Sequence, residues 1–421
     1  MTGSISPPPT KRRKVRAECG NLTDFGATLE TSTTTAASDP SDQPVHIISW
    51  NINGITPFVR HHLTKPITNY FSKSPKSVRI PSSQSGLSQP PSLRAFLCRH
   101  NYPHLLFLQE VKINSKDEAT QRAVQAAINT PESSETAQLP PTYTAHFTLP
   151  CDPHNARGFG GRIYGVVSII RDDFADRCVS AVRTVDWDVE GRVSIVEITS
   201  PQPRHPIPSP LPPSAKPSAP RPASSHDDKP STAHPSNIAV FNIYAVNGTN
   251  NAYKDPKTGT TCGTRHDRKL AFHKLLMEES LRYEARGWAV ILGGDMNVAP
   301  ARIDGYPNLR TYPREHIVNR ADFNTRFLLG EDMKALGGNE DGEHVFQGID
   351  IWRTLHGPEA SGYTYYPRGT AWGASCDRVD YFVISKGLYE EGKVVEAEIH
   401  ANALERGPSD HVPISMVLSL R

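Results

Sequence analysis

Runs of apolar, often β-branched residues recur along the chain, and most of them end in a short polar segment. These runs lack the polar alternation of a strand with one solvent face, so they predict strands buried on both faces. The expected strands are residues 45–50, 105–108, 164–170, 193–198, 238–244, 289–292, 381–384 and 413–418. Residues 267–286 instead place apolar side chains near a 3.6-residue period, which predicts a helix. This alternation predicts an α/β fold in which two packed sheets are covered by helices.

Four segments lack the apolar residues that a folded core requires. Residues 1–43 are rich in Ser, Thr, Pro and Asp, and we expect them to form a disordered tail. Residues 72–92, 129–141 and 201–236 predict inserted loops, and the closely spaced prolines of the last one exclude a helix or a central strand. Long surface insertions cost little loop-closure entropy, so they need not separate domains.

The composition, charge and cysteines set limits on the class of protein. Pro accounts for 37 of 421 residues and hydrophobic residues for only 37%, so part of the chain is not core. The formal net charge of +2 at pH 7 excludes a histone-like polycation. We find no run of 18 apolar residues and no secretory signal, and we expect a soluble intracellular protein without membrane contact. The six cysteines show no metal-binding pair and no disulfide framework, so we expect reduced thiols.

Residues 11–16 hold five basic residues in six positions. This pattern predicts import into the nucleus or attraction to nucleic acid. The alternative is a solvated basic run without function. We expect nuclear localisation.

Six polar clusters follow directly on, or lie beside, the predicted strands, where a rigid sheet would fix their geometry. They contain Asn51 and Asn53; Glu110 and Lys112; Tyr244 and Asn247; Asp295 and Asn297; Arg378 and Asp380; and Asp410 and His411. One such cluster alone would carry little weight, because carboxylates at strand ends are commonly caps or turn formers. Six clusters together predict a functional site.

The residue types in these clusters suit metal-assisted hydrolysis of a phosphate ester. Carboxylates and amides supply the hard oxygen ligands that Mg²⁺ or Mn²⁺ prefers. Asp295 and Asn297 stand two residues apart, so an extended segment would place a base and an amide donor on one side, facing a water molecule. His411, held beside a carboxylate such as Asp380, would be suited to stabilise an oxyanion.

Six sequence motifs stand in the order found in a known superfamily. They are SWNINGI at 49–55, LQEVK at 108–112, EGRV at 190–193, GDMNVAP at 294–300, RVDYF at 378–382 and SDHVPI at 409–414. Together they resemble the endonuclease/exonuclease/phosphatase superfamily, and within it the exonuclease III branch of apurinic/apyrimidinic endonucleases. The resemblance covers roughly residues 44–421, which would form one catalytic domain. It implies the DNase I-like fold, a four-layer α/β sandwich in which two packed, mostly antiparallel sheets are flanked by helices.

The resemblance also implies a role for each matching residue. Asp295 would activate the attacking water, Asn297 would orient it, and His411, held by Asp380, would bind the scissile phosphate. Tyr244 would contact the phosphate or the leaving oxygen. The implied metal ligands, with Glu110 as the principal one, are Asn51, Asn53, Glu110, Asp295, Asn297, Asp410 and His411. The implied substrate-binding residues are Lys112, Asn247, Tyr363, Tyr365 and Arg378, of which the two tyrosines resemble the aromatic wall of a pocket for a sugar without its base.

The implied activity is Mg²⁺-dependent cleavage of DNA 5′ to abasic sites, with removal of 3′ blocking groups or nucleotides, and Mn²⁺ as a substitute ion. The partner would be double-stranded DNA with abasic sites or damaged 3′ ends, bound by a monomer. The Pro-rich residues 201–236 would be either a docking site for an SH3-type protein or a solvated loop.

One departure from the family pattern affects the substrate. The family often has Gly-Trp or Gly-Leu before the Arg of its Arg-x-Asp motif, whereas Cys376 and Asp377 stand here. An acidic residue in that place puts the abasic-sugar pocket in doubt. Two alternatives therefore stay open: a related phosphodiesterase acting on general DNA, RNA or tyrosyl-DNA, and a non-catalytic binder of damaged DNA.

Overall fold

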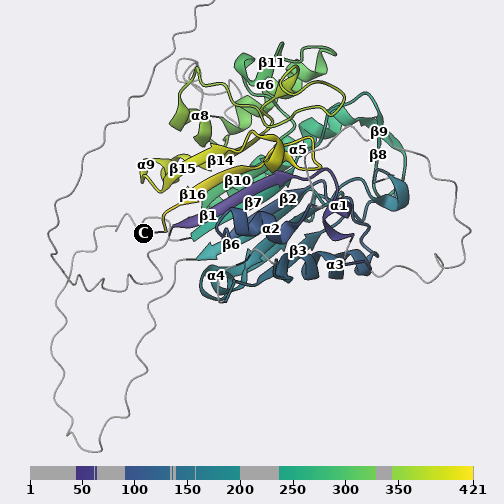
Figure 1. The fold of residues 1–421 in the computed structure, drawn as a ribbon. Helices are drawn as coiled ribbons and strands as arrows, with labels where there is room; N and C mark the ends of the chain where they lie inside the picture. The colour runs from purple at the N-terminus through teal and green to yellow at the C-terminus, as the bar shows by residue number, and fades with distance from the viewer. Residues whose placement is uncertain are drawn as a thin grey trace, which may run out of the picture. The chain divides into compact units, whose positions relative to one another are not determined.

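The computed structural model describes residues 44–60, 62–63, 91–132, 135, 139–156, 158–199, 237–328 and 344–420. Two six-stranded sheets pack face to face in this part of the chain (Figure 1). The first sheet runs in the order β15 (Val394–Ile399), β16 (Ile414–Leu418), β1 (Val45–Asn51), β2 (Leu105–Gln109), β4 (Val166–Arg171) and β3 (Tyr143–Thr148). The second runs in the order β12 (Gly348–Asp350), β14 (Asp380–Ser385), β10 (Ala289–Asp295), β7 (Asn237–Tyr244), β6 (Val193–Thr199) and β5 (Val179–Thr184).

Strand direction is mostly antiparallel, as the sequence predicts. β1 and β2 are parallel, as are β7 and β10, and the other neighbouring strands of both sheets run antiparallel. Two short ribbons stand apart from the large sheets: β8 (Ala252–Lys254) with β9 (Thr261–Thr264), and β11 (Gly305–Tyr306) with β13 (Cys376–Asp377). The predicted four-layer α/β sandwich is confirmed.

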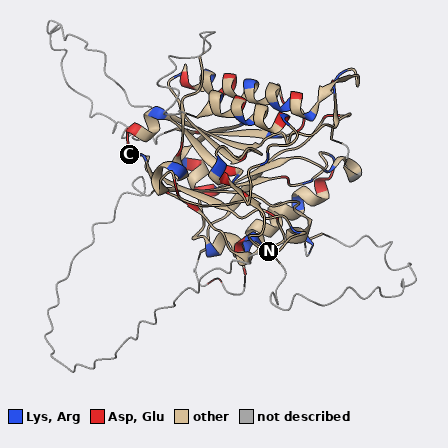
Figure 2. Cartoon of the chain, turned by 90° about the horizontal axis from the view of Figure 1, so that it is seen from above, with Lys and Arg blue, Asp and Glu red and all other residues tan. Residues whose placement is uncertain are grey.

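Helices cover the outer face of each sheet. The first sheet is covered by α1 (Thr56–Val59), α2 (Leu93–Arg99) and α3 (Glu118–Asn129), and the second by α5 (Arg265–Glu284) and α6 (Glu315–Phe327). Shorter helices are α4 (Asp172–Cys178), α8 (Ile351–His356), α9 (Lys386–Glu390) and α10 (Ala403–Arg406), with 3₁₀ turns at Phe159–Gly161 and Arg302–Asp304. Figure 2 shows charged residues of both signs along the helices.

The core explains why the strands read as continuous apolar runs. Successive side chains of a strand point to opposite faces. In β1, Ile47 therefore packs between the two sheets, whereas Ile48 and Trp50 pack under the helices of the outer layer. The same division holds in β7, where Val240 faces the other sheet and Phe241 faces α5. Both faces are buried, so no polar alternation is needed.

Helix α5 starts two residues before the predicted boundary. Thr264 caps it by accepting a hydrogen bond from the backbone of Asp267, and the Asp267 carboxylate accepts one from the backbone of Thr264. Asp267 is thus the third residue of the helix and not its first. The helix ends at Glu284, before Gly287 turns the chain with a positive φ of 78°.

The register of the second sheet brings three polar side chains together at one end. Asp295, the last residue of β10, lies opposite Tyr244 of β7 and opposite Asp380 of β14. Gly294, with φ +140°, permits this approach, because a Cβ there would lie 2.0 Å from the carbonyl oxygen of Ile243. In the first sheet, Asn51 pairs with Gln109 at the corresponding strand ends.

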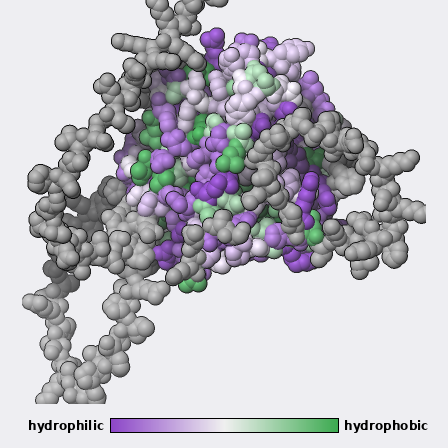
Figure 3. All heavy atoms as spheres, viewed as in Figure 1, coloured by the Kyte–Doolittle hydropathy of each residue, from purple (hydrophilic) through white to green (hydrophobic). Residues whose placement is uncertain are grey.

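Several predictions concern residues outside the described part of the chain. These are the tail at 1–43, the Pro-rich segment 201–236, most of 72–92 and part of 129–141. Among the described helices, none is long and apolar enough to cross a membrane. Figure 3 shows a mainly hydrophilic described surface on one face, with hydrophobic residues in separate spots.

Candidate active site

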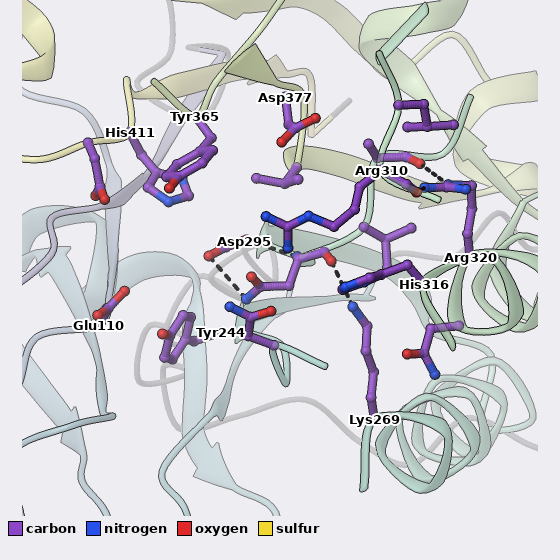
Figure 4. A pocket seen from close by; sticks show the side chains of 18 residues that line it. Glu110, Tyr244, Lys269, Asp295, Arg310, His316, Arg320, Tyr365, Asp377 and His411 are labelled. Carbon is purple, nitrogen blue, oxygen red and sulfur yellow. Dashed lines mark hydrogen bonds between the residues drawn. The ribbon is translucent and has the colours of Figure 1, made fainter. Parts of the chain in front are cut away.

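Residues that are far apart in the sequence line one cavity at the ends of β7 and β10 (Figure 4). Its volume is about 240 Å³. The predicted site residues on its wall are Glu110, Tyr244, Asn247, Asp295, Asn297, Tyr365, Asp410 and His411. Because the two sheets contribute different members of this set, their packing assembles the site.

Asn51 joins the two sheets beneath the cavity. It is fully buried, and its Nδ2 donates hydrogen bonds to Asp295 Oδ2 at 2.9 Å and to Glu110 Oε2 at 3.3 Å. Its own Oδ1 accepts a hydrogen bond from the backbone of Asn53 at 3.0 Å. Asn51 therefore fixes a carboxylate of each sheet relative to the other.

Asp295 is a buried carboxylate that lies near both a negative charge, on Asp380, and a positive charge, on His411. Burial and, to a smaller extent, the nearby Asp380 raise its pKa to about 7, against the opposing effect of His411. The backbone N–H of Asn297 donates to Asp295 Oδ1 at 2.8 Å, and the Asn297 amide donates to Asp295 Oδ2 at 3.3 Å. A carboxylate with a pKa near neutrality is well matched to accept a proton from water.

His411 and Asp380 form a buried ion pair across the sheets. Nδ1 of His411 lies 2.7 Å from Asp380 Oδ2. Burial alone would lower the pKa of His411, but Asp380, with Asp295 and Asp410, outweighs it and raises the pKa to about 10. His411 is thus an imidazolium at neutral pH. Trp50 Nε1 also donates to the His411 carbonyl oxygen at 3.1 Å, which fixes the segment.

Oxygen atoms converge on a positive charge at the Glu110 side of the cavity. The Lys112 ammonium lies 2.9 Å from Glu110 Oε1 and donates to Asn53 Oδ1, while the Asn53 amide donates to Asp410 Oδ1 at 2.9 Å. Here the ammonium stands where a small cation would find carboxylate and amide oxygens. This donor set suits a hard divalent cation.

A second group of potential ligands comprises Asp295, Asp380 and His411, whose ligand atoms lie within 4.8 Å of one another. Two of these atoms already form the His411–Asp380 hydrogen bond, and an imidazolium repels a cation. Asp380 Oδ1, in contrast, is buried without a hydrogen-bond partner in the described part of the chain. The Glu110 side therefore fits a metal ion better than the histidine side.

Backbone strain concentrates at this site. Asn53, Glu110, Lys112 and Asn297 adopt left-handed conformations with φ between 51° and 55°. Non-glycine residues avoid this region, at a cost of about 1 kcal/mol or more each for residues other than Asn. The tight turns that follow β1, β2 and β10 bring these side chains back over the strand ends.

Tyr244 lies at the edge of the cavity with its hydroxyl protonated. Burial raises the pKa of the hydroxyl well above its usual value, and Glu110 raises it further. The Arg192 guanidinium lies 4.9 Å from the Tyr244 ring centre and donates to the Tyr244 carbonyl oxygen at 3.1 Å. Arg192 is itself held by Glu190, which also binds Arg265.

Three predicted substrate-binding residues do not line the cavity. Lys112 forms an ion pair with Glu110, at 2.9 Å. Tyr363 packs against Tyr366, Cys376 and Val412. Arg378 is buried and pairs with Asp304 at 2.6 Å and with Asp350 at 2.7 Å. The position of Arg378 thus differs from the predicted one: it supports the fold beneath the site and has no access to the cavity.

The sequence analysis missed one wall of the cavity. Its residues are Lys269, Leu309, Arg310, His316, Asn319 and Arg320, together with Asp377, which the sequence analysis noted only as a departure. The available signal was the density of arginines at 302, 310, 314 and 320, between two motifs. Lys269 gave no signal, because one lysine on an amphipathic helix looks like a solvated residue.

Known structures share this fold. The catalytic domain of APE2 from Xenopus laevis is 17% identical, with 89% of this chain and 92% of that chain aligned at a TM-score of 0.50. The AP endonuclease LMAP from Leishmania major is 18% identical, with 93% and 92% aligned at a TM-score of 0.51. At these identities the likeness is one of fold.

Comparison with curated protein sequences gives no match. A family model described as the endonuclease/exonuclease/phosphatase family matches residues 48–411. This span contains Asn51, His411 and the carboxylates that line the cavity. The chain belongs to the endonuclease/exonuclease/phosphatase family.

Proposed function

We propose that the protein is a metal-dependent DNA-repair phosphodiesterase that cleaves DNA 5′ to abasic sites and removes 3′ blocking groups or nucleotides. The observation that carries the proposal is the placement of Asp295, a carboxylate with a pKa of about 7, beside the imidazolium of His411 in one cavity. Family membership supports phosphodiester hydrolysis. Two fold neighbours are AP endonucleases, which supports the choice of substrate.

Asp295 and Asn297 would act on the attacking water. The raised pKa of Asp295 lets it take a proton at neutral pH, and Asn51 holds the carboxylate in place. The Asn297 amide donates to the carbonyl oxygen of Ala245 at 2.9 Å, so its orientation is set before substrate binds. Because Asp295 and Asn297 are both held in fixed orientations, a water molecule bound to them would attack phosphorus from one direction.

His411 and Tyr244 would act on the phosphate. The Nε2–H of the His411 imidazolium can donate a hydrogen bond to a phosphate oxygen, and Asp380, bonded to Nδ1, stabilises the positive charge of the ring as negative charge develops on the phosphate. Tyr244 has a protonated hydroxyl at the cavity edge, which can donate to the leaving oxygen.

Glu110, with Asn53 and Asp410, fits a divalent cation, because oxygens of Glu110 and Asn53 already bind the ammonium of Lys112 and Asp410 is hydrogen-bonded to Asn53. We propose Mg²⁺, with Mn²⁺ as a substitute. When bound, such an ion supplies Lewis-acid stabilisation of charge on the phosphate oxygens. Asn51 would orient the Glu110 carboxylate toward it.

A broader substrate range is the second candidate. It is favoured by Asp377 and the charged residues on the wall that an abasic sugar would face. A general nuclease of the same chemistry would cut intact duplex and abasic duplex at equal rates.

The test is incision of a labelled duplex with one tetrahydrofuran abasic analogue, in Mg²⁺ and in EDTA, by the full chain. We expect Mg²⁺-dependent cutting at the analogue, reduced about a thousandfold in Asp295→Asn, since general-base groups contribute roughly 10²–10⁴. Asp173→Asn, an exposed carboxylate on α4, is the matched control and should cut normally. Equal cutting of intact duplex would replace the repair assignment by the broader one, and no metal-dependent cutting would refute both.

Nuclear localisation and a monomeric state are also proposals. The basic residues 11–16 lie outside the described part of the chain, and they support import by their composition. A fluorescent fusion of the full chain should enter nuclei, and replacing Lys11, Arg12 and Arg13 with Ala should keep it out. For residues 201–236, the alternative to a docking site for a protein partner is a solvated loop, and unchanged folding and incision after deletion of that segment would support the loop.

A further inference from the structure

The wall of the cavity beyond Asp295 carries a concentration of cations. Lys269 comes from α5, Arg310 from the segment between β11 and α6, and Arg320 from α6. We call these three residues the cationic wall. The groups proposed to act on the scissile phosphate come from other elements: Tyr244 ends β7, and His411 lies just before β16.

Arg310 is free to meet a ligand. It is exposed, and its side chain makes no hydrogen bond or ion pair with the described residues. Figure 4 shows its guanidinium reaching into the cavity in the direction of Asp295. A guanidinium presents several donors in a planar fork, which suits a phosphate or a carboxylate.

The other two cations are held in place by backbone carbonyls. Lys269 is 2% exposed, and its ammonium donates to the Asn297 carbonyl oxygen at 2.7 Å. Arg320 donates to the carbonyl oxygens of Ala299 at 2.8 Å and Arg310 at 2.7 Å. These contacts fix the positions of the charges without neutralising them.

Among the described residues, one carboxylate shares this wall, Asp377, and its charge attracts both Arg310 and Arg320 without a direct ion pair, so three cations face one anion here. Asp377 lines the cavity, yet within the described residues it forms no ion pair with Arg310 or Arg320. Burial, together with both arginines and against the attraction of Asp295, lowers the pKa of Lys269 to about 7. The positive charges thus repel one another in a partly desolvated space, which an anion would relieve.

We propose that Lys269, Arg310 and Arg320 form a second anion subsite, which binds a negatively charged group of the substrate other than the scissile phosphate. The proposal rests on the proposed function and adds a basis for substrate choice. Two sources share this chemistry: the next phosphate along a DNA strand, and a carboxylate on a 3′ blocking group. An uncharged abasic sugar alone would leave the subsite empty.

The test measures binding rather than turnover, so that it does not depend on activity. Fluorescence anisotropy in EDTA, with the full chain carrying Asp295→Asn, compares two pairs of labelled duplexes. One pair ends in a 3′-phosphoglycolate or in the 2-hydroxyethyl ester of the 3′-phosphate, which lacks the carboxylate. The other pair carries an internal tetrahydrofuran analogue, followed on its 3′ side by a natural phosphate or by an uncharged methylphosphonate.

We expect the charged member of at least one pair to bind more tightly, and Arg310→Ala to reduce that preference roughly tenfold or more, the size of a charge-assisted hydrogen bond. Arg310→Lys should keep part of the preference. Arg314→Ala is the matched control, because Arg314 is exposed on the same segment but does not line the cavity. A loss confined to one pair identifies the source of the anion.

Two results would overturn the proposal. One is an unchanged preference in Arg310→Ala with its melting temperature intact. The other is an equal weakening of both members of each pair, which would mean general attraction of DNA by charge. Failure of the proposed function is distinguishable, because it would appear as absence of incision by the wild type in Mg²⁺ while these binding ratios remain measurable.

Discussion

Two groups of buried charges lie at the same end of the second sheet and differ in how their charge is balanced. In one, the guanidinium of Arg378 sits between the carboxylates of Asp304 and Asp350, and Arg353 adds a second cation to Asp304. In the other, which we call the catalytic cluster, the carboxylates outnumber the cations around a single imidazolium; its members are Asn51, Glu110, Asp295, Asp380 and His411.

The comparison indicates a criterion: the balance of charges within a buried group distinguishes one that supports the fold from one that serves a reaction. A balanced group keeps its charges at neutral pH and holds segments together. The catalytic cluster is left unbalanced, and burial together with the charge of Asp380 raises the pKa of Asp295 to about 7. Perturbed ionisation of this kind is the expected signature of a catalytic site. The following predictions test this distinction.

The largest effect should come from Arg378→Met. Removing the guanidinium leaves two buried carboxylates without their shared partner, and breaking such a pair costs about 3–5 kcal/mol. Urea unfolding would measure the loss. Arg122→Met is the control, because its ion pair with Glu118 is exposed and should cost under about 0.5 kcal/mol. If Arg378→Met instead keeps its stability and loses only DNA affinity, the residue binds substrate after all.

Asp295→Asn should have the opposite effect on stability. The pKa of Asp295 is raised in the folded state, so ionisation destabilises the fold, and wild-type stability falls as pH rises from about 4 to about 7. The variant lacks this loss, and the difference between the two proteins should change by something on the order of 4 kcal/mol over that range. Unfolding in EDTA at several pH values checks the slope. Parallel curves for the two proteins would contradict the assignment.

Glu190 should show the reverse pH dependence, because this buried carboxylate pairs with two guanidinium groups, those of Arg192 and Arg265. Burial alone would raise its pKa, but Arg192 and Arg265 outweigh burial and lower it to about 2. The stability it contributes is present above about pH 4.5 and lost as pH falls toward 2. Relative to Glu190→Gln, the wild type should lose about 3 kcal/mol over that interval. Acid unfolding curves would measure it, and a wild type that gains stability toward low pH would refute it.

The smallest effect concerns the helix beneath the cationic wall. Thr264→Ala removes the side-chain cap of α5 and should cost about 1 kcal/mol of unfolding free energy. The cap lies more than one helical turn before Lys269, so the preference for anionic substrates should not change. Urea unfolding and the anisotropy comparison would separate the two effects. A large loss of anion preference would show that the wall depends on how the helix begins.

Much of the fold was predictable because local and global signals agree. The strands are buried on both faces, and continuous apolar runs report that burial directly. The carboxyl ends of β1 and β10 were predicted to carry Asn51 and Asp295, and the structure joins them by a 2.9 Å hydrogen bond. The motifs were sufficient to predict that these residues meet, since each motif follows its own strand.

The cationic wall and the place of Arg378 depend on contacts that the sequence does not encode locally. Asp304 precedes Arg378 by 74 residues, and a motif cannot reveal that this carboxylate neutralises it. Lys269 is buried, and its ammonium donates to the Asn297 carbonyl oxygen, 28 residues further along the chain. The predicted start of α5, at Asp267, is two residues too late. Asp is common at helix starts, but Asp267 is the third residue of the helix, and Thr264 is the cap.

The adjacency of the first and last strands of the first sheet has a consequence for synthesis. β16 pairs with β1, and His411 lies just before β16, so the cavity is complete only when residues 414–418 have paired with residues 45–49. During synthesis, Glu110 and Asp295 leave the ribosome before His411 does. The residues that line the cavity can therefore come together only after β16 has been made.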